Sequence, residues 1–377
     1  MRIAILESII MPAGHEVEFD RILVDELKKQ GHTPCFFVPE RFPFKINYGV
    51  EIDYLEGGEV VTYAGVSELK KIWLSLVREK RRIDWFNSAY AKAKAGKCDA
   101  IIVPTSTYRY LRTLCNSKLK HSPVPVYFIF HGINPKEQPK FERQANNCLP
   151  YKNIHLRVIT LRNDFANSDL TNLRLINPPV FKPQDLPLRE EIQGKNPIKI
   201  GFFGQFRKEK NLAFFLDAFV QANFTVPVEL IVQGATAKPE DGEVFEQYAK
   251  DYAKYKNITF WHKNLIGLAW QQALLDVDII IMPYAAERYR YHWSAMLFTA
   301  IGFYKPILIS PEINPEVLAK YKIGAAVQLD SVEIFARQLE SFIDDFAKHT
   351  NIYRKNLLLA NKEYSHEALI KNILDEN

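Results

Sequence analysis

The segment IKIGFFGQFRKEKNLAFFLDAF, residues 198–219, joins a buried strand to a helix through a polar turn. The apolar run predicts a strand that ends at Gly204, and a helical pattern follows the turn. Arg207, Lys208 and Lys210 lie in the turn itself. Backbone N–H groups and the helix dipole favour negative charge at such a position, so the segment suits a phosphate group. A solvated basic turn that binds nothing is the alternative.

The same alternation of short apolar runs with helical patterns extends over most of the chain. Strands separated by helices imply parallel sheets covered on both faces. We therefore expect an α/β protein with two doubly wound, Rossmann-like domains that face each other across a cleft, where ligands of such sheets bind. The first set of strands is expected at 2–6, 33–39, 99–106 and 124–130, and the second at 198–204, 228–234, 257–262, 278–284, 306–310 and 324–329.

A proline-rich segment separates the two sets of strands. Residues 177–197 hold five prolines and no periodic pattern, which is typical of a linker between domains. We expect an N-terminal domain over 1–187 and a C-terminal domain over 188–350. The last helical segment, 351–377, is expected to cross back to the first domain.

The composition is that of an ordinary soluble globular protein. Of the 377 residues 47% are hydrophobic and 25% charged, and the formal net charge of +5 is too small to indicate a nucleic-acid-binding protein. The four cysteines form no CxxC pair, so no zinc ribbon or thioredoxin-type motif is written here. The apolar N-terminal stretch carries Glu7, which argues against a secretory signal, and no run of about 18 uncharged apolar residues could span a bilayer. We expect a cytoplasmic protein.

The basic turn matches a known pattern. Gly204, Glu209 and Lys210 are spaced as in the G-(R)-x-x-x-E-K-G segment of retaining nucleotide-sugar glycosyltransferases of the GT-B fold, which this stretch resembles. In that family the lysine and a nearby arginine hold the donor diphosphate. The resemblance implies this role for Lys210. The family's arginine position is Gln205 here, and Arg207 is expected to supply the missing charge.

A second match follows at the spacing expected for the C-terminal domain of that family. Residues 282–310 resemble its P-S/Y…E-x7-E…G-x-P-V-I segment, and the resemblance implies that the helix after this loop directs its N-terminus at the donor. Branches of the family that read YRYR-x-SG match Tyr289, Arg290, Tyr291 and Ser294, and further matches lie at Lys305, Pro306, Ile307, Pro315, Glu316 and Gly324.

The two glutamates of the family fall on other residue types here. The first falls on Tyr291 and the second on Thr299. In the family the second glutamate binds the ribose hydroxyls, and a threonine cannot bind two hydroxyls as a carboxylate does. Thr299 and Ser294 are therefore expected to contact ribose or phosphate. Glu287 is a candidate contact to the sugar, with an exposed loop carboxylate as the alternative.

Other candidate residues follow the ends of predicted strands. Gly234 ends the run VELIVQG, where the resemblance implies a position against the nucleotide base. Gly14 and His15 lie in the first strand-to-helix loop, which the family keeps near the donor phosphates and the acceptor. His131 follows the strand at 124–130, and the resemblance implies that it faces the reacting sugar. A structural histidine is the alternative.

The resemblance implies a retaining glycosyltransferase that moves a sugar from a nucleotide-diphosphate donor to a hydroxyl of a glycan or lipid-linked acceptor, in cell-surface polysaccharide or lipopolysaccharide synthesis. His131, Lys210 and Arg207 are the expected catalytic residues. We expect no metal and no cofactor besides the donor, because the DxD at 276–278 begins a buried strand. A non-catalytic scaffold that binds a nucleotide sugar or a partner enzyme, and a nucleotide-sugar epimerase, are the alternatives.

One helical segment bears on the acceptor. Residues 68–86 place Leu69, Ile72, Trp73, Leu76 and Val77 at helical spacing among six basic residues. A basic amphipathic helix with a tryptophan suits the surface of an anionic membrane, which would put the protein at the inner face of the membrane and favour a lipid-linked acceptor. The alternative is a helix that faces the core and has a solvated basic side.

Overall fold

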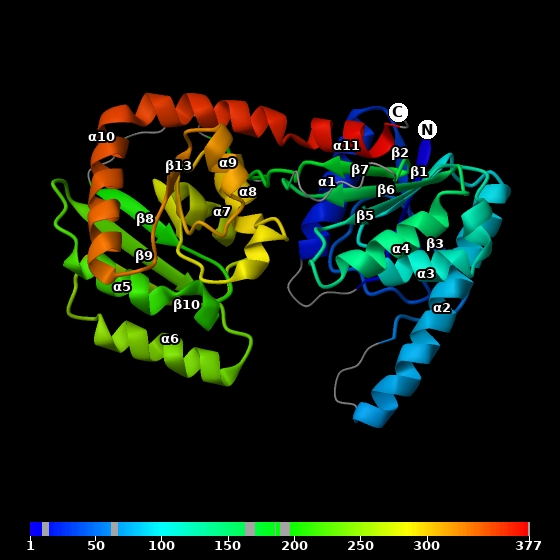
Figure 1. Ribbon diagram of the computed structural model, residues 1–377, viewed down its shortest axis with the longest axis horizontal. Helices are drawn as coiled ribbons and strands as arrows, with labels where there is room; N and C mark the ends of the chain where they lie inside the picture. Colours follow the sequence, from blue (N-terminus) through cyan, green and yellow to red (C-terminus); the bar gives the residue numbers. More distant parts are fainter. Residues whose placement is uncertain (10–14, 62–66, 163–169, 185, 189–196, 376–377) are drawn as a thin grey trace. The chain divides into compact units, whose positions relative to one another are not determined.

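Apolar runs of the chain become parallel strands in two separate sheets (Figure 1). The computed structural model describes residues 1–9, 15–61, 67–162, 170–184, 186–188 and 197–375. Contacts divide the chain into unit 1, Met1–Asn177 with His366–Asn377, and unit 2, Pro178–Ser365. Each unit holds one sheet covered by helices, so the prediction of an α/β protein with two Rossmann-like domains is confirmed.

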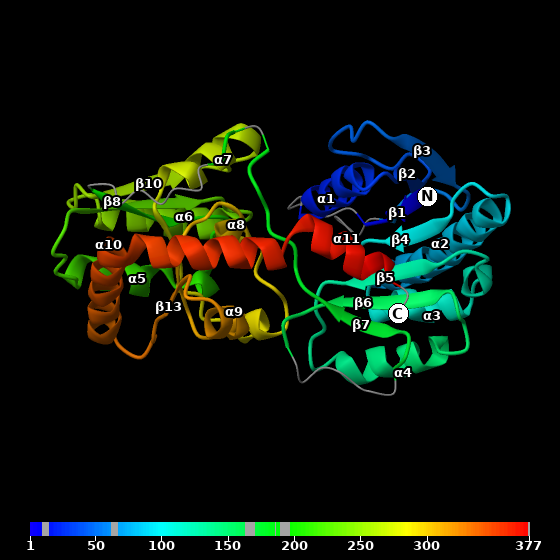
Figure 2. The same cartoon turned by 90° about the horizontal axis from the view of Figure 1, so that it is seen from above.

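The sheet of unit 1 has the strand order β3-β2-β1-β4-β5-β6-β7, and all its pairings are parallel (Figure 2). Ala4 and Leu6 of the central strand join a core with Trp85 and Phe86, and alternation along the strand turns Ile5 to the opposite face. The strands are β1 (Arg2–Leu6), β2 (Thr33–Pro39), β3 (Glu51–Leu55), β4 (Ala100–Val103), β5 (Val126–Phe130), β6 (Ile154–Ile159) and β7 (Leu173–Ile176), and the helices are α1 (His15–Lys29), α2 (Glu68–Lys94), α3 (Tyr108–Cys115), the 3-10 helix η1 (Lys118–His121), α4 (Gln138–Cys148) and α11 (His366–Leu374).

Three strands of unit 1, β3, β6 and β7, were not expected from the sequence. Strand β3 lies at the edge of the sheet and most of its side chains are exposed, so it lacks an apolar run. Arg157 interrupts the apolar residues of β6, and Arg174 interrupts those of β7. A buried arginine inside a strand is unusual unless its donors find acceptors.

The acceptors for Arg157 are carbonyl groups at the end of α11. Its Nε donates to the carbonyl oxygens of Asn372 and Ile373, both at 3.1 Å, and its Nη2 donates to that of Asp375 at 2.6 Å. Tyr127 of β5 donates its hydroxyl to the carbonyl of Leu374 at 3.2 Å. The last turn of a helix leaves such carbonyls without intrahelical partners, so these bonds fasten α11 to the sheet of unit 1.

The sheet of unit 2 has the order β10-β9-β8-β11-β12-β13, again with parallel pairings throughout. Its interior strands β8, β9, β11 and β12 are mostly apolar and buried, as strands covered on both faces are expected to be, whereas the edge strands β10 and β13 are more exposed. The strands are β8 (Ile198–Phe202), β9 (Val228–Gly234), β10 (Ile258–His262), β11 (Ile279–Met282), β12 (Ile307–Ile309) and β13 (Gly324–Ala326), and the helical elements are η2 (Lys208–Lys210), α5 (Leu212–Gln221), α6 (Pro239–Asp251), α7 (Gly267–Asp276), η3 (Glu287–Arg290), α8 (Ala295–Gly302), α9 (Pro315–Lys320) and α10 (Val332–Glu363).

The proline-rich segment begins as part of unit 2. Val180 donates its N–H to the carbonyl of Tyr364 at 2.9 Å, and the ring of Phe181 stacks on Trp293 with centroids 5.8 Å apart. A Cβ at Gly302 would lie 2.0 Å from the carbonyl oxygen of Phe181, so only glycine allows this approach. The units therefore divide at residues 177 and 178, whereas the sequence analysis placed the boundary at 187 and 188.

The helical segment expected over 351–377 is shared between the units. Its first part is the end of α10, which belongs to unit 2 and has a non-helical residue at His349. Its second part is α11, which belongs to unit 1. Among the helices of the described residues, none is long and apolar enough to cross a membrane.

We predict that Arg157→Met destabilises unit 1 by about 1–3 kcal/mol, because it leaves buried carbonyls of α11 without donors. Arg174→Met is the matched control, since Arg174 forms a half-exposed ion pair with Asp375 at 2.8 Å and its loss should cost less than about 1 kcal/mol. Urea denaturation measures both. Equal losses in the two variants would show that the Arg157 guanidinium does not anchor α11.

Candidate functional site

The turn after β8 is built around a glycine. Gly204 has φ of 104°, in the region that side chains rarely adopt, and a Cβ there would lie 3.0 Å from the Nζ of Lys210. Its N–H donates to the Oε1 of buried Gln233 at 2.8 Å, and the Nε2 of Gln233 donates to the carbonyl of Lys263 at 2.6 Å. Gln233, which the sequence analysis did not single out, therefore fixes the turn against the carboxyl end of β9.

Lys210 is a buried cation in this turn, with 8% of its surface exposed. Its ammonium donates to the carbonyl of Phe203 at 3.1 Å and lies 4.9 Å from the centroid of the Tyr284 ring. Burial, together with the nearby guanidinium groups of Arg207 and Arg288, lowers the pKa of Lys210 to about 7. A ligand that carries negative charge would reverse both effects.

Two arginines share one carboxylate beside Lys210. Glu209 forms an ion pair with Arg288, and its Oε1 lies 3.7 Å from the Nη1 of Arg207. Arg207 also donates to the Oε1 of Gln205 at 3.1 Å. The guanidinium of Arg288 lies over the ring of Tyr289, 4.9 Å from its centroid. Positive charge therefore exceeds negative charge around the turn.

Arg288 was not among the candidates from the sequence. The motif comparison directed attention to the residues that follow it, and its closeness to Glu209 depends on how η3 folds against η2. The backbone shows this contact as well, since the N–H of Ala285 donates to the carbonyl of Glu209 at 2.8 Å.

Ser294 lies at the N-terminus of α8. Its Oγ accepts a hydrogen bond from the N–H of Leu297 at 3.4 Å, as an N-cap residue does. Its own N–H donates to the Oδ1 of Asn314 at 2.9 Å. The helix dipole favours an anion at this end of α8.

Thr299 is buried inside α8, and its hydroxyl donates to the carbonyl of Ala295 at 2.8 Å. A ligand could therefore only donate to Thr299, because the hydroxyl has a single proton. The hydroxyl of Tyr291 donates to the Oε1 of exposed Glu287 at 3.0 Å, which joins these two candidates on η3. Ligand contacts for all three stay predictions.

Gly234 has a packing role that the sequence did not reveal. A Cβ there would lie 2.4 Å from the ring of Phe245 on α6, so the glycine lets the helix approach β9. Asp278, of the DxD at 276–278, is buried and accepts a hydrogen bond from the N–H of Lys199 at 2.9 Å through its Oδ2. The base contact proposed for Gly234 stays a prediction.

The remaining candidates belong to unit 1. His131 follows β5, its Nε2 donates to the carbonyl of Pro104 at 2.8 Å, and Phe19 packs against its ring with centroids 4.7 Å apart. Because a carbonyl can only accept, this bond makes Nδ1 the acceptor of the neutral ring. His15 begins α1, and Gly14 lies outside the described residues.

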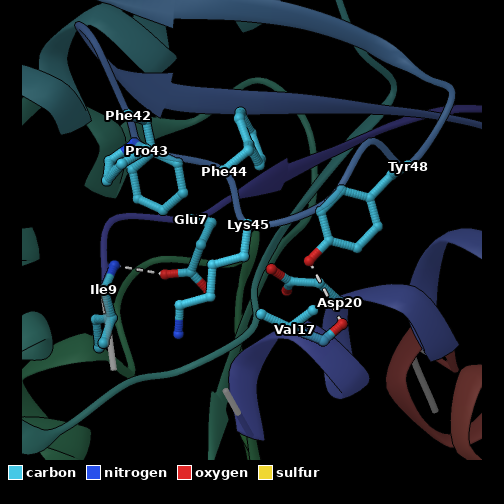
Figure 3. Close-up of a pocket in the computed structure, with 9 residues that line it drawn as sticks. All are labelled: Glu7, Ile9, Val17, Asp20, Phe42, Pro43, Phe44, Lys45 and Tyr48. Carbon is cyan, nitrogen blue, oxygen red and sulfur yellow. Dashed lines mark hydrogen bonds between the residues drawn. The ribbon is translucent and has the colours of Figure 1, made fainter. Parts of the chain in front are cut away.

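Unit 1 also holds a small cavity of about 20 Å³, room for about one water molecule, at the carboxyl end of β1 (Figure 3). Glu7 follows β1, and its Oε1 accepts hydrogen bonds from the next two backbone N–H groups, both at 2.6 Å. Asp20 of α1 is buried at the same pocket. Neither carboxylate was a sequence candidate for a site. The segment after β2 supplies Phe42, Pro43, Phe44, Lys45 and Tyr48, and Ile9 and Val17 complete the lining (Figure 3).

Comparison with known structures identifies the fold. No protein-family model and no curated protein sequence matches the chain. Solved structures of GT-B glycosyltransferases match nearly all of it, so the chain has the GT-B fold that the sequence predicted.

Three of these structures illustrate the likeness. Alr3699/HepE from Anabaena in complex with UDP has a TM-score of 0.67 at 14% identity, over 99% of this chain and 99% of that chain. The lipopolysaccharide outer core galactosyltransferase WaaB in its apo form has 0.63 at 13%, over 99% of both chains. An α,α-trehalose-phosphate synthase (UDP-forming) from Burkholderia xenovorans, in complex with glucose-6-phosphate, has 0.62 at 9%, over 98% of both chains.

The lowered pKa of Lys210 predicts a pH dependence of stability. The unfolded chain keeps this lysine protonated up to about pH 10.5 and the folded chain only to about pH 7, so the unfolded state binds more protons in between. The wild-type free energy of unfolding should therefore rise between pH 7 and 10, by about 1.4 kcal/mol per unit of pKa difference.

Lys210→Met should lack this rise, so the stability of the variant relative to wild type should be highest at pH 7 and fall toward pH 10. Lys199→Met, at a half-exposed lysine near the amino end of β8, is the matched control and should keep the wild-type slope. Guanidinium denaturation across the pH range measures the slopes. The same slope in Lys210→Met and wild type would contradict the prediction.

Proposed function

We propose that this protein is a glycosyltransferase that moves a sugar from a nucleotide-diphosphate donor to a hydroxyl of a glycan or lipid-linked acceptor, with retention and without a metal ion, in cell-surface polysaccharide or lipopolysaccharide synthesis. The observation that carries the proposal is the buried ammonium of Lys210 beside Arg207 and Arg288. The likeness to glycosyltransferase structures over the whole chain supports it.

The donor side of the reaction needs little from side chains beyond positive charge. When the bond from the sugar to the diphosphate breaks, negative charge grows on the leaving phosphate oxygens. Preorganised cations and a helix N-terminus stabilise this charge without having to reorganise. In unit 2, Lys210, the two arginines and the N-terminus of α8 at Ser294 supply such groups. Diphosphate binding raises the pKa of Lys210, so the lysine is charged in the complex at neutral pH.

The acceptor side is proposed for unit 1. Glu7 and Asp20, at the carboxyl end of β1, are carboxylates of the kind that accept hydrogen bonds from hydroxyl groups, and aromatic side chains of the segment after β2 lie beside them. His131, held by Pro104 and Phe19, has a fixed ring orientation and would position the transferring sugar. Gly14 and His15 would complete this side of the reaction.

The donor proposal is tested by calorimetric titration with UDP, GDP and ADP, and with CMP as a control, first without and then with magnesium. UDP is the first candidate because HepE from Anabaena is solved with UDP and with UDP-glucose. Lys210→Ala should weaken diphosphate binding by about tenfold or more, since a charge-assisted contact contributes roughly 1.5–3 kcal/mol. Arg288→Ala should weaken it as well, whereas Lys199→Ala should not.

Product analysis separates the alternatives. Transfer requires an acceptor, an epimerase converts the nucleotide sugar alone, and a scaffold turns over nothing. Wild-type protein that binds none of the diphosphates would contradict the proposed function, and unchanged affinity in Lys210→Ala would contradict the role of this lysine.

A membrane-linked acceptor is supported by the first half of α2. The second half of this helix packs into unit 1, where Trp85 and Phe86 are buried. The first half extends beyond the sheet (Figure 1), and Ile72, Trp73 and Leu76 are 65%, 60% and 68% exposed there. Four of the five charged residues over 70–80 are basic. Exposed apolar side chains among lysines suit an anionic lipid surface, and we place the protein at the cytoplasmic face of the membrane.

We predict that the protein sediments with vesicles of phosphatidylglycerol and phosphatidylcholine but not with phosphatidylcholine alone. Trp73→Ser with Leu76→Ser should weaken this binding by about tenfold or more, because the inserted apolar area is lost. Ile352→Ser with Leu359→Ser, at exposed positions of α10, is the matched control. Unchanged vesicle binding, or self-association that the α2 variant abolishes, would show that the surface serves another partner.

A further inference from the structure

Two cysteines of unit 1 lie together at the ends of neighbouring helices. Cys115 is the last residue of α3 and Cys148 the last residue of α4, and these helices pack against each other. Their Sγ atoms are 3.9 Å apart and form a thiol hydrogen bond. Cys148 is fully buried, whereas Cys115 is partly exposed. One sulfur is thus open to a reagent from solvent and the other is held directly behind it.

The surroundings shift the pKa values of the two thiols in opposite directions. The hydrogen bond from the Cys148 thiol lowers the pKa of Cys115, and the charge of Lys120 lowers it further. The same hydrogen bond and burial raise the pKa of Cys148. Lys120 is fixed at this place because its Nζ donates to the carbonyl of Cys115 at 2.9 Å. The partly exposed thiol of Cys115 therefore ionises more readily than that of Cys148, as in cysteines that react with oxidants.

The other two cysteines provide an internal contrast. Cys35 and Cys98 are buried, and burial raises the pKa of both thiols. Cys35 belongs to β2 and Cys98 precedes β4, and β1 lies between these strands in the sheet. Neither is placed to react early with an oxidant.

We propose that Cys115 and Cys148 are a redox modification site, at which a peroxide converts the two thiols into a disulfide. The site is independent of the proposed glycosyltransferase activity. In the disulfide the sulfurs are about 2.05 Å apart, so they must approach from 3.9 Å by rotation of the side chains.

The chemistry proceeds in two displacement steps. The Cys115 thiolate attacks one oxygen of hydrogen peroxide, the O–O bond breaks, and hydroxide leaves to give a sulfenic acid. The Cys148 sulfur then attacks the sulfenic sulfur, the S–O bond breaks, and the departing hydroxide takes the thiol proton to form water. The cysteines are oxidised and the peroxide is reduced, so that two thiols and one peroxide give one disulfide and two waters.

The cross-link would enclose residues 116–147, a segment that carries β5 and His131.

The test is treatment of the full-length chain with hydrogen peroxide, followed by alkylation of the remaining thiols and peptide mass spectrometry. We expect loss of two of the four thiols and a linked peptide pair that contains Cys115 and Cys148. Cys35→Ser with Cys98→Ser should keep the link. Cys115→Ser should lose thiols about tenfold more slowly, because the reactive thiolate is gone. In Cys148→Ser, dimedone should label Cys115 as a sulfenic acid.

Three results would overturn the proposal. They are thiol loss as fast in Cys115→Ser as in wild type, a link between two chains in place of one within a chain, and oxidation of Cys115 beyond the sulfenic acid with Cys148 still reduced. Circular dichroism checks that each variant is folded. Cys148→Ala, which removes the buried sulfur without adding a hydroxyl, replaces Cys148→Ser should the serine variant fail to fold.

Discussion

The buried ammonium of Lys210 is the constraint around which the turn after β8 in unit 2 is arranged. It lies beside Gly204, whose φ of 104° favours glycine, and that glycine is held in turn by Gln233. It requires that the nearest carboxylate, Glu209, be bound by Arg288 and not neutralise the lysine. A carboxylate pairing directly with Lys210 would make the unit more stable and the site a poorer one for anions.

The strands of unit 2 could be predicted because most of them are short apolar runs, and the interior ones are buried. Those of unit 1 could be predicted only in part. Arg157 makes β6 look like a polar segment. Its guanidinium can be buried in the sheet because it donates hydrogen bonds to carbonyls more than two hundred residues further along the chain. Local sequence contains no sign of that pairing. Val180 and Phe181 likewise join unit 2 through contacts with distant residues, which local sequence does not reveal.

For the candidate site, sequence reasoning found the residues that follow a strand directly, such as Gly204 and Lys210. It missed Gln233 and Arg288, because a side chain that reaches a turn from another strand or loop leaves no mark at a fixed spacing. Thr299 shows the reverse case. It occupies a motif position, yet its hydroxyl proton is already donated to the carbonyl of Ala295 in the same helix. Spacing identifies where a residue lies, and the neighbouring strands decide what it can do.

Unit 1 consists of two segments that are far apart in the chain, and this affects the order in which the two units become structured during translation. Unit 2 is continuous over Pro178–Ser365, so all of it is synthesised before α11. Unit 1 begins earlier, but Arg157 and Tyr127 must wait for the carbonyls of α11. The first sheet to be synthesised is therefore the last to be completed, and the part of it that α11 covers stays open for as long as the whole of unit 2 takes to be translated.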